Sequence, residues 1–397
     1  MDVEPYDVCV LGGGPAGSVA AALLARAGAR CVLLEREAFP RFHVGEALSP
    51  RALPVLDALG LAESVDRRFT CAVGLHFTCC RTGRQRAVPW SLGLRGSHPR
   101  GWHVPRGAFD ALLLERARAL GVDVRAPCTA EDVLFEDGHA RGVRARTPDG
   151  ARVGFLAQVI LDATGRDTLL GARVAGRQPI PGLDATALFA HFVGARRRTD
   201  HIGAFLEVLL FPHGWLWHLP LPGEVSSLGA VCSEAWVRAR RKGEALEPFF
   251  QRTLEDAPAA KEVLAPARRL TPVQAIAGLS YRCERRAGDG FLLLGDAGGS
   301  VDPFPPLGLL GALEGARRAA LAVEKALGAG DTSAERFELW EAWYRAQEAR
   351  HQALARALYG GALETLLFDA PGSAGLQALA SALAGDALDV DFTAWSE

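Results

Sequence analysis

The chain has 397 residues, of which 49% are hydrophobic, and a formal net charge of −2 at pH 7. This length allows two or three packed units with substantial cores. The near-neutral charge provides no broad basic field, so nucleic acid is not an expected partner. No run of about twenty apolar residues is present, so we predict no membrane span. The N-terminus lacks a basic segment followed by an apolar run, and we therefore expect no signal peptide and a cytoplasmic protein.

Eight cysteines are spread along the chain without a C-x-x-C pair or a histidine spacing suited to zinc. Cysteines inside predicted core strands behave as small hydrophobic residues. We interpret them as structural thiols and predict no metal site.

The first predicted strand, Tyr6–Leu11, runs directly into a glycine-rich turn that reads G-G-G-P-A-G at residues 12–17. In such a turn Gly12 permits the tight bend, Gly14 lets the backbone approach a pyrophosphate, and Gly17 lets the following helix pack against the sheet. The pattern predicts a dinucleotide site, because an alanine-rich helix and a second strand follow it as that fold requires.

The helix spans Ser18–Ala27, and the second strand, Cys31–Glu35, ends on an acidic residue. Glu35 is placed to bind ribose hydroxyls. A loop rich in proline, glycine and charged groups follows at residues 39–50, and loops of this kind often face a ligand.

The middle of the chain alternates between two predicted sheets. A helix at residues 51–59 precedes strands near 73–78 and 85–90, and the chain then returns through a second helix, Ala108–Leu120. Residues 132–162 are predicted to form short strands, because Asp137-Gly138 and Asp149-Gly150 are hairpin turn signals. A β-meander inserted in a nucleotide-binding sheet favours an FAD fold over a simple NAD domain.

The later part of the chain carries two further motifs. Residues 171–284 are predicted to alternate strands with polar loops, and they contain the string G-W-L-W-H-L-P at 214–220. Residues 291–299 read F-L-L-L-G-D-A-G-G, a strand that ends beside Asp296, and a helix is expected to start near Gly308 with its N–H groups toward a flavin. Beyond residue 330 the pattern is helical, with an amphipathic run at 334–359.

Three elements together, at residues 12–17, 162–166 and 295–303, resemble the FAD-dependent monooxygenase superfamily. The strings R-F-H-V-G-E at 41–46 and W-L-W-H-L-P at 215–220 resemble the flavin-dependent halogenases, in particular those that act on phenols and pyrroles. The similarity extends from residue 1 to about residue 325. It implies an α/β protein with a glutathione-reductase-type FAD-binding Rossmann fold, an inserted β-meander, a β-sheet substrate domain and C-terminal helices.

The domain limits follow from the same pattern. We predict a discontinuous FAD-binding domain at 1–65, 104–170 and 286–330, a substrate-binding β-sheet domain at 66–103 and 171–285, and a C-terminal helical region at 331–397.

The resemblance breaks down at one residue. Halogenases of this type carry a lysine in an F-x-x-K-x-G pattern, and the matching stretch here is F-T-C-A-V-G, with Ala72 at the lysine position. The chain has only three lysines, Lys242, Lys261 and Lys325. Arginine is no substitute, because its guanidinium stays protonated. Halogenation is therefore disfavoured, and Pro305-Pro306-Leu307 also replaces the small hydroxylated residues that halogenases tend to carry.

The leading hypothesis is an FAD-dependent monooxygenase that hydroxylates an aromatic or electron-rich substrate, which is small, carrier-tethered or peptidyl. Molecular oxygen is then a co-substrate, and electrons come from NAD(P)H, directly or through a separate flavin reductase. A reductase or dehydrogenase of the geranylgeranyl-reductase type is the alternative. A non-catalytic flavoprotein that binds a partner through its C-terminal helices is a third.

The candidate residues fall into three groups. His43, Glu46 and His218 are candidate acid–base residues, although His218 alternates with the tryptophans and can instead be a structural histidine on the other face of the strand. Trp215, Trp217 and Pro220 are expected to line the substrate site. The predicted FAD contacts are Gly12, Gly14, Ala16, Gly17, Glu35, Arg36, Arg41, Arg106, Asp162, Gly295, Asp296, Pro303, Gly308 and Leu309.

Overall fold

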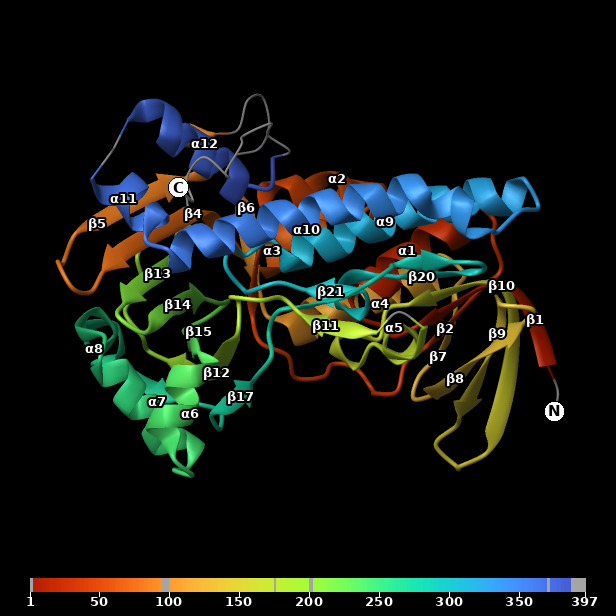
Figure 1. Cartoon of the computed structure of the whole chain (residues 1–397), viewed down its shortest axis with the longest axis horizontal. Coiled ribbons are helices and arrows are strands. Elements are labelled where there is room, and N and C mark those ends of the chain that lie inside the picture. Colours follow the sequence, from red (N-terminus) through yellow and green to blue (C-terminus); the bar gives the residue numbers. More distant parts are fainter. Residues whose placement is uncertain (1–2, 94–99, 175, 200–202, 370–371, 387–397) are drawn as a thin grey trace.

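The computed structural model describes residues 3–93, 100–174, 176–199, 203–369 and 372–386. Two large sheets lie at opposite ends of the molecule, and two long helices run along one side from one sheet to the other (Figure 1). The predicted α/β architecture with two sheets and C-terminal helices is confirmed.

The first sheet is the nucleotide-binding type predicted from the glycine-rich turn. Its strands are β1 (Val3–Leu11), β2 (Cys31–Leu34), β7 (Asp123–Arg125), β10 (Arg152–Asp162), β19 (Ala287–Gly288) and β20 (Phe291–Leu293). They are ordered β19-β20-β10-β1-β2-β7, and all neighbours are parallel except β19 and β20. Parallel strands need crossovers, which α1 (Pro15–Arg26) and α4 (Arg106–Ala119) provide here.

The predicted meander is present as β8 (Thr129–Glu136) and β9 (His139–Arg146), which pair antiparallel and continue into β10. The first hairpin turn has positive φ at both Asp137 (48°) and Gly138 (81°), as a type I′ turn requires. Strand β10 therefore pairs with β9 and, farther along, with β20 on one edge and with β1 on the other, which joins the meander to the nucleotide sheet.

The second sheet has ten strands, ordered β16-β12-β15-β14-β13-β4-β6-β3, with β17 paired to β12 and β5 to β4. These strands are β3 (Glu46–Leu48), β4 (Thr70–Cys79), β5 (Gln85–Pro89), β6 (Gly101–Val104), β12 (Ala185–Val193), β13 (Ala204–Phe211), β14 (Gly214–Pro220), β15 (Val225–Ser233), β16 (Arg268–Arg269) and β17 (Gln274–Ile276). Strand β3 falls within the range 1–65 predicted for the FAD-binding domain, yet it pairs with β6 at the edge of this second sheet.

Three short strands form a small third sheet beside the first two. They are β11 (Arg177–Pro179), β18 (Tyr281–Cys283) and β21 (Gly299–Ser300). Short helical segments connect the larger elements: η1 (Pro50–Ala52), α2 (Leu53–Leu59), α3 (Ala62–Arg68), η2 (Trp90–Leu92), η3 (Gly165–Asp167), α5 (Leu169–Val174), η4 (Gly295–Ala297) and η5 (Ala334–Phe337).

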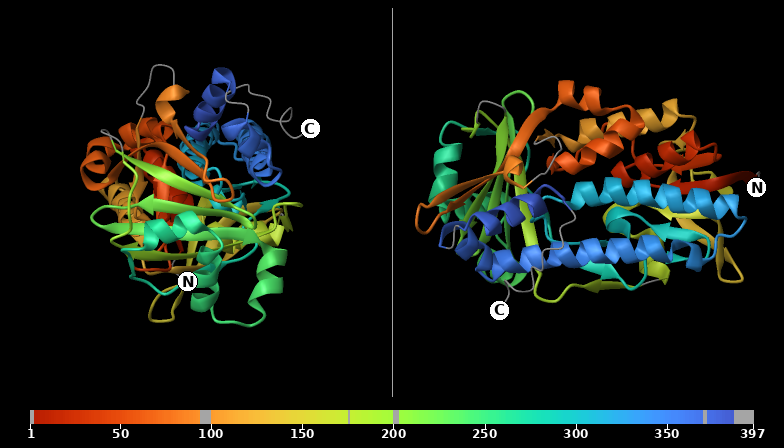
Figure 2. Two further views of the ribbon diagram at one scale, coloured as in Figure 1. Left: turned by 90° about the vertical axis from the view of Figure 1, so that its left-hand side faces the viewer. Right: turned by 90° about the horizontal axis from the view of Figure 1, so that it is seen from above.

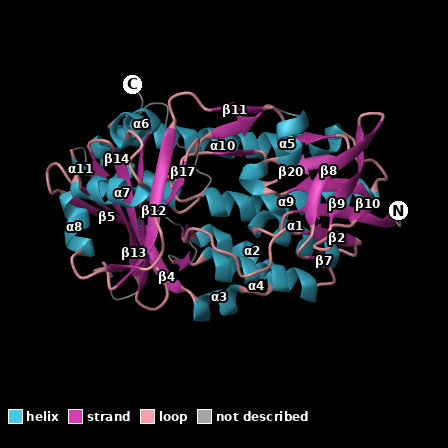
Figure 3. Ribbon diagram, turned by 90° about the horizontal axis from the view of Figure 1, so that it is seen from below, coloured by secondary structure: helices cyan, strands magenta, loops and turns pink. Residues whose placement is uncertain are grey.

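The expectation of only strands and polar loops at 171–284 is wrong in one stretch, which holds α6 (Glu234–Arg241), α7 (Leu246–Glu255) and α8 (Pro258–Leu264). Phe249, Phe250 and Leu254 of α7 bury one face of that helix against the second sheet. Figure 3 shows these helices at the end of the molecule farthest from the nucleotide sheet. They cover the face of the second sheet that points away from the nucleotide-binding sheet.

The C-terminal region is helical as predicted, with α9 (Gly308–Gly328), α10 (Glu338–Tyr359), α11 (Ala362–Phe368) and α12 (Ser373–Leu383). Helices α9 and α10 lie alongside each other (Figure 2, right). Leu363, Leu367 and Leu379 of α11 and α12 belong to the same buried cluster as the inward face of β4. These helices are thus packed against the second sheet rather than set apart from it.

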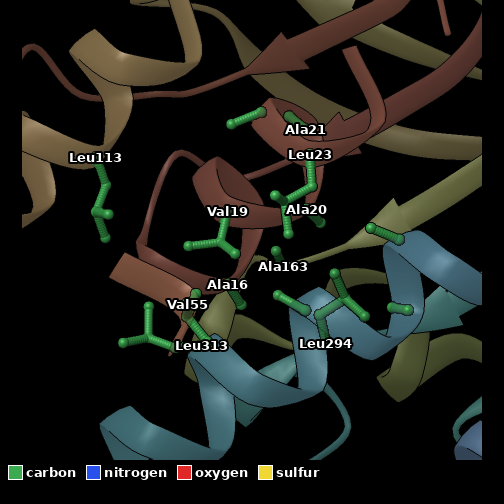
Figure 4. Packing of buried hydrophobic residues seen from close by; sticks show 14 of the residues in the cluster. Ala16, Val19, Ala20, Ala21, Leu23, Val55, Leu113, Ala163, Leu294 and Leu313 are labelled. Carbon is green, nitrogen blue, oxygen red and sulfur yellow. The ribbon is translucent and has the colours of Figure 1, made fainter. Parts of the chain in front are cut away.

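The core around α1 explains how its N-terminus reaches the cofactor region. Ala16, Val19 and Ala20 of α1 and Leu313 of α9 belong to one buried cluster (Figure 4). Small side chains let the two helices approach closely, so both N-termini converge on the carboxyl ends of the parallel strands. Over the described residues, neither α9 nor α10, the longest helices, nor any other helix has the length and apolar character needed to cross a bilayer.

Candidate flavin and substrate site

A cavity of about 680 Å³ lies between the nucleotide sheet and the second sheet. One end is lined by the turn after β1 and by the ends of β2 and β10, and the other by β12, β13 and β14. Ligands of open α/β sheets bind beyond the carboxyl ends of the strands, which is where this cavity begins.

The glycine-rich turn has the geometry of a phosphate cradle. Gly12 has φ +100°, and a Cβ on it would lie 2.4 Å from the carbonyl oxygen of Ala163. A Cβ on Gly17 would lie 2.0 Å from the carbonyl oxygen of Gly12, whereas one on Gly14 would meet only the Arg41 guanidinium at 3.6 Å. Backbone N–H groups, the helix N-terminus and Arg41 therefore suit a pyrophosphate, and the site fits FAD here.

Glu35 lies where a ribose binder is expected. Its side chain is buried, its Oε2 accepts the N–H of Gly13 at 2.7 Å, and its Oε1 accepts the N–H of Glu37 at 2.8 Å. Each carboxylate oxygen keeps a second lone pair, and Glu35 lines the cavity. The neighbouring Arg36 also lines the cavity and pairs with Asp167.

The second FAD-like motif, which begins at Gly295, lines the cavity between its two ends. Gly295 has φ +55°, and Asp296 follows it in η4 at the cavity wall. Burial raises the pKa of Asp296, against the opposing effect of nearby arginines. Gly308 opens α9, so the N-terminus of this helix points at the same space, and Leu309 and Pro303 complete the wall.

A buried ion network lies beside the predicted flavin position. The Arg106 guanidinium donates to Glu46 through Nη1 and to both oxygens of Asp110, with Nε to Oδ1 at 2.7 Å and Nη2 to Oδ2 at 3.0 Å. Burial works to lower the pKa of Arg106, but Asp110 and Glu46 outweigh it and raise that pKa. Burial also raises the pKa of the Glu46 carboxyl, more than Arg106 lowers it.

His43 lines the cavity next to this network. Its Nδ1 lies 4.0 Å from Oε1 of Glu46 and 3.3 Å from the carbonyl oxygen of Val44. Burial, together with the positive charges of Arg106 and Arg41, lowers the pKa of His43 to about 3. The imidazole is therefore neutral at physiological pH, and a ring nitrogen can accept a hydrogen bond.

The far end of the cavity is an aromatic wall. Trp215 and Trp217 point from the same face of β14 with ring centroids 5.9 Å apart, and Trp215 meets the Phe304 ring edge-on at 5.8 Å. The ring centroid of Phe189 lies 6.1 Å from that of Trp217. Apolar side chains of β12, β13 and the 276–279 segment fill the remainder of the wall, so the site suits an uncharged ring.

Most of the predicted site residues come together in this one cavity. The cavity is lined by Gly12, Gly14, Ala16, Glu35, Arg36, Arg41, His43, Glu46, Arg106, Trp215, Trp217, Gly295, Asp296, Pro303, Gly308 and Leu309.

Four predicted site residues lie outside the cavity lining. Asp162 is fully buried and accepts the N–H groups of Thr164 and Leu170, and Gly17 is pressed against Gly12. His218 faces the other side of β14, where its Nδ1 lies 2.5 Å from Glu207, and the carbonyl of Pro220 accepts from His103. The predicted contacts of these four residues with cofactor or substrate stay predictions.

Asp302 is a cavity residue that was not among the sequence-based candidates. It is fully buried, its Oδ1 accepts the N–H of Phe304 at 2.9 Å, and its Oδ2 accepts the hydroxyl of Tyr359 at 2.6 Å. Burial raises the pKa of this carboxyl to about 6. The only sequence signal was its position in the string V-D-P at 301–303, and nothing in the sequence pointed to Tyr359.

Ala72 lies on β4 with no exposed surface and belongs to the same apolar cluster as Trp215 and Trp217. The described residues that line the cavity include no lysine. Among the described parts of the chain, no group of three or more His, Cys, Asp or Glu side chains is arranged to hold a metal ion.

Comparison with known proteins agrees with this geometry. The model of the FAD binding domain family matches residues 5–330. The Pseudomonas fluorescens chlorinase of 1H-pyrrole-2-carbonyl peptidyl-carrier protein is 30% identical over 375 residues, which cover 87% of this chain and 81% of the relative. Tryptophan 2-halogenase of Chondromyces crocatus is 28% identical over 367 residues, which cover 89% of this chain and 67% of the relative.

Two solved structures share the fold. The myxobacterial chondrochloren halogenase CndH matches with a TM-score of 0.82 at 32% sequence identity. The match covers 86% of this chain and 79% of the CndH chain. The flavin-dependent brominase Bmp2 matches with a TM-score of 0.83 at 25% sequence identity, and the match covers 96% of this chain and 94% of the Bmp2 chain. The chain therefore belongs to the FAD binding domain family and is an FAD-dependent oxidoreductase related to the flavin-dependent halogenases.

Proposed function

We propose that this protein is an FAD-dependent monooxygenase that hydroxylates a neutral aromatic or otherwise electron-rich substrate. The observation that carries the proposal is the fully covered Ala72 at the lysine position, together with a described cavity lining that contains no ammonium group. Without that group, an oxidised halogen has no carrier between flavin and substrate, whereas direct oxygen transfer needs none.

The chain's own residues bind and orient the reactants. The glycine-rich turn, Glu35 and Arg41 hold the dinucleotide, and the N-terminus of α9 favours negative charge beside the flavin ring. When bound, reduced FAD supplies the electrons that activate molecular oxygen. The aromatic wall excludes water and holds the substrate ring, and exclusion of water protects oxygen transfer from loss to solvent.

Proton handling near the flavin is assigned to His43 and Glu46. The neutral imidazole of His43 can accept a hydrogen bond from a group at the flavin edge, and the Glu46 carboxyl, whose pKa burial raises, can exchange a proton there. Acid–base help of this kind contributes about 10²–10⁴-fold to a rate.

The substrate is an uncharged aromatic unit, presented as a small molecule, on a carrier or in a peptide. The similarity to the pyrrole-carrier chlorinase and to tryptophan 2-halogenase supports heteroaromatic rings. Electrons are supplied by NAD(P)H, directly or through a separate flavin reductase.

The test uses the FAD-loaded protein with NADH and a flavin reductase, and a panel of phenol, phloroglucinol, indole, tryptophan and tryptophan-containing peptides. Mass spectrometry should find a product heavier by one oxygen atom in air and no product without oxygen. Turnover that persists anaerobically would instead identify a reductase or dehydrogenase. If the FAD-loaded protein converts no member of the panel, with or without oxygen, a binding protein would be favoured.

A further inference from the structure

The Asp302 carboxylate occupies an unusual position among the acidic groups of the cavity wall. It lies at the aromatic end, where Phe304 and Trp215 are its neighbours, and its hydrogen bonds come from the neutral donors Phe304 N–H and Tyr359 O–H. The other end of the cavity holds its carboxylates differently, for example Glu46 with Arg106. Burial therefore acts on Asp302 without a cation to offset it.

Tyr359 extends this carboxylate toward the surface. It is the last residue of α10, its hydroxyl donates to Oδ2 of Asp302 at 2.6 Å, and the residue as a whole is 38% exposed. Asp302 itself has no exposed surface yet belongs to the cavity wall. The pair thus links the cavity wall to a residue that is partly exposed to solvent.

We propose that Asp302 and Tyr359 form the proton-transfer route between the reaction cavity and solvent. The proposal rests on the proposed function only for its purpose, since a phenol or an indole is attacked more easily once its O–H or N–H proton is withdrawn, and it takes a proton back after the oxygen is transferred.

The transfer is a balanced movement of one proton. The bond between the substrate and its acidic hydrogen breaks as an O–H bond forms on Asp302. Once Asp302 is protonated, the Tyr359 hydroxyl must turn its hydrogen away from the carboxyl and accept a hydrogen bond from it. Tyr359 then takes that proton on its oxygen and releases its own hydroxyl proton to water, which restores the carboxylate. Nothing is oxidised or reduced in these steps, and the net result is one proton moved from substrate to solvent.

The surroundings are suited to a carboxyl group that changes its protonation state near neutrality. The groups that face the pair are His351 on α10, Trp215 on β14 and, farther from it, Cys232 on β15. The indole N–H of Trp215 interacts with Asp302 and lowers its pKa, although it makes no hydrogen bond of regular geometry. Burial is the larger effect and holds the pKa of Asp302 at about 6.

Trp215 provides a readout that needs no turnover. Its indole lies beside the carboxyl, so protonation of Asp302 should change its fluorescence, and subtraction of the Trp215→Phe signal isolates that change from the other tryptophans. In the FAD-loaded protein we expect a transition near pH 6 that is absent in Asp302→Asn. In Tyr359→Phe it should move up by about one pH unit, because the carboxylate loses a hydrogen bond.

The structure offers a matched control. The hydroxyl of Tyr6 donates to Oδ2 of Asp123 over the same 2.6 Å, in the nucleotide sheet and outside the cavity lining. Tyr6→Phe should leave the transition in place.

The route itself is tested by the rate of protonation after a pH jump, followed by stopped-flow fluorescence. Tyr359→Phe should slow the Trp215 signal at least tenfold, and Tyr6→Phe should not. Equal rates in the wild type and Tyr359→Phe would overturn the route and leave a purely structural pair. A transition that persists in Asp302→Asn would overturn the assignment of the carboxyl. Both measurements are independent of the reaction, so a failed search for hydroxylation does not decide them.

Discussion

The Arg106 guanidinium bridges Glu46, on strand β3 of the second sheet, and Asp110, one turn farther along its own helix. Asp110 has no exposed surface, and only 9% of the Arg106 side chain is exposed. This buried cation therefore bridges two carboxylates at the point where the two sheets meet, and Arg41, 3.5 Å from Oδ2 of Asp110, adds a second positive charge.

Removal of this cation should be costly. In Arg106→Met, the buried Asp110 keeps only the more distant Arg41, 3.5 Å from its Oδ2, and the partly buried Glu46 loses its arginine, so we expect a loss of about 3 kcal/mol in the free energy of unfolding. Urea denaturation checks this. The control is Arg67→Met, because Arg67 also pairs with a carboxylate four residues away but both side chains are exposed, and this change should cost less than about 1 kcal/mol. Similar losses in the two variants would contradict the role given to the network.

Gly17 should not tolerate a side chain. A Cβ there would lie 2.0 Å from the carbonyl oxygen of Gly12, so Gly17→Ala must displace the turn that cradles the pyrophosphate. We expect at least a tenfold loss of FAD affinity, measured by titration of the apoprotein with FAD. Gly328→Ala, also in a helix but with open space around its Cα, should bind FAD as the wild type does. Unchanged affinity in Gly17→Ala would show that the turn adapts.

Ala72 should reject an ammonium group. Ala72→Met adds bulk to a fully covered position and should cost about 1–3 kcal/mol of stability. Ala72→Lys adds nearly the same bulk together with a charge that must be desolvated, and should cost several kcal/mol more. Unfolding in urea separates the two. Equal stability of both variants would mean that the position reaches solvent or a counter-ion, and that a halogenase-like lysine could be accommodated.

Stability should fall in mild acid because of His103. This residue is fully buried, its Nδ1 lies 3.0 Å from the carbonyl oxygen of Pro220, and burial lowers its pKa to about 3. The unfolded chain takes up a proton below about pH 6.5 while the folded chain does not, so the contribution to stability is present above pH 6.5 and lost as the pH falls toward 3.

His103→Gln removes that proton linkage. The stability difference between wild type and this variant should therefore shrink by about 1.4 kcal/mol for each pH unit between 6 and 4. Urea midpoints at several pH values measure it. A difference that stays constant with pH would show that His103 is already protonated in the folded protein.

The nucleotide half of the site could be predicted because its signals are local. The turn at 12–17 and the hairpin turns at 137–138 and 149–150 need particular backbone angles, and glycine or aspartate supplies them in the sequence itself. The period of two along β14 likewise separates Trp215 and Trp217 from His218, whose position on the outer face was one of the two interpretations that the sequence allowed.

The remaining features depend on contacts between distant residues. Asp162 precedes a glycine-containing turn as a cofactor ligand would, yet its carboxylate closes that turn on Leu170 instead. Helices α6–α8 are short, and α7 is stabilised by burial of Phe249 and Phe250 against the second sheet. The local sequence pattern does not predict that burial. Asp302 and Tyr359 are 57 residues apart, and only the packing of α10 brings them together.

The central claim is that oxygen, rather than halogen, is transferred. It is tested most directly by turnover of an accepted aromatic substrate under ¹⁸O₂ in the presence of chloride and bromide, with the products examined by mass spectrometry. Our account predicts a single ¹⁸O atom in the product and no halogen. A chlorinated or brominated product without ¹⁸O would contradict it.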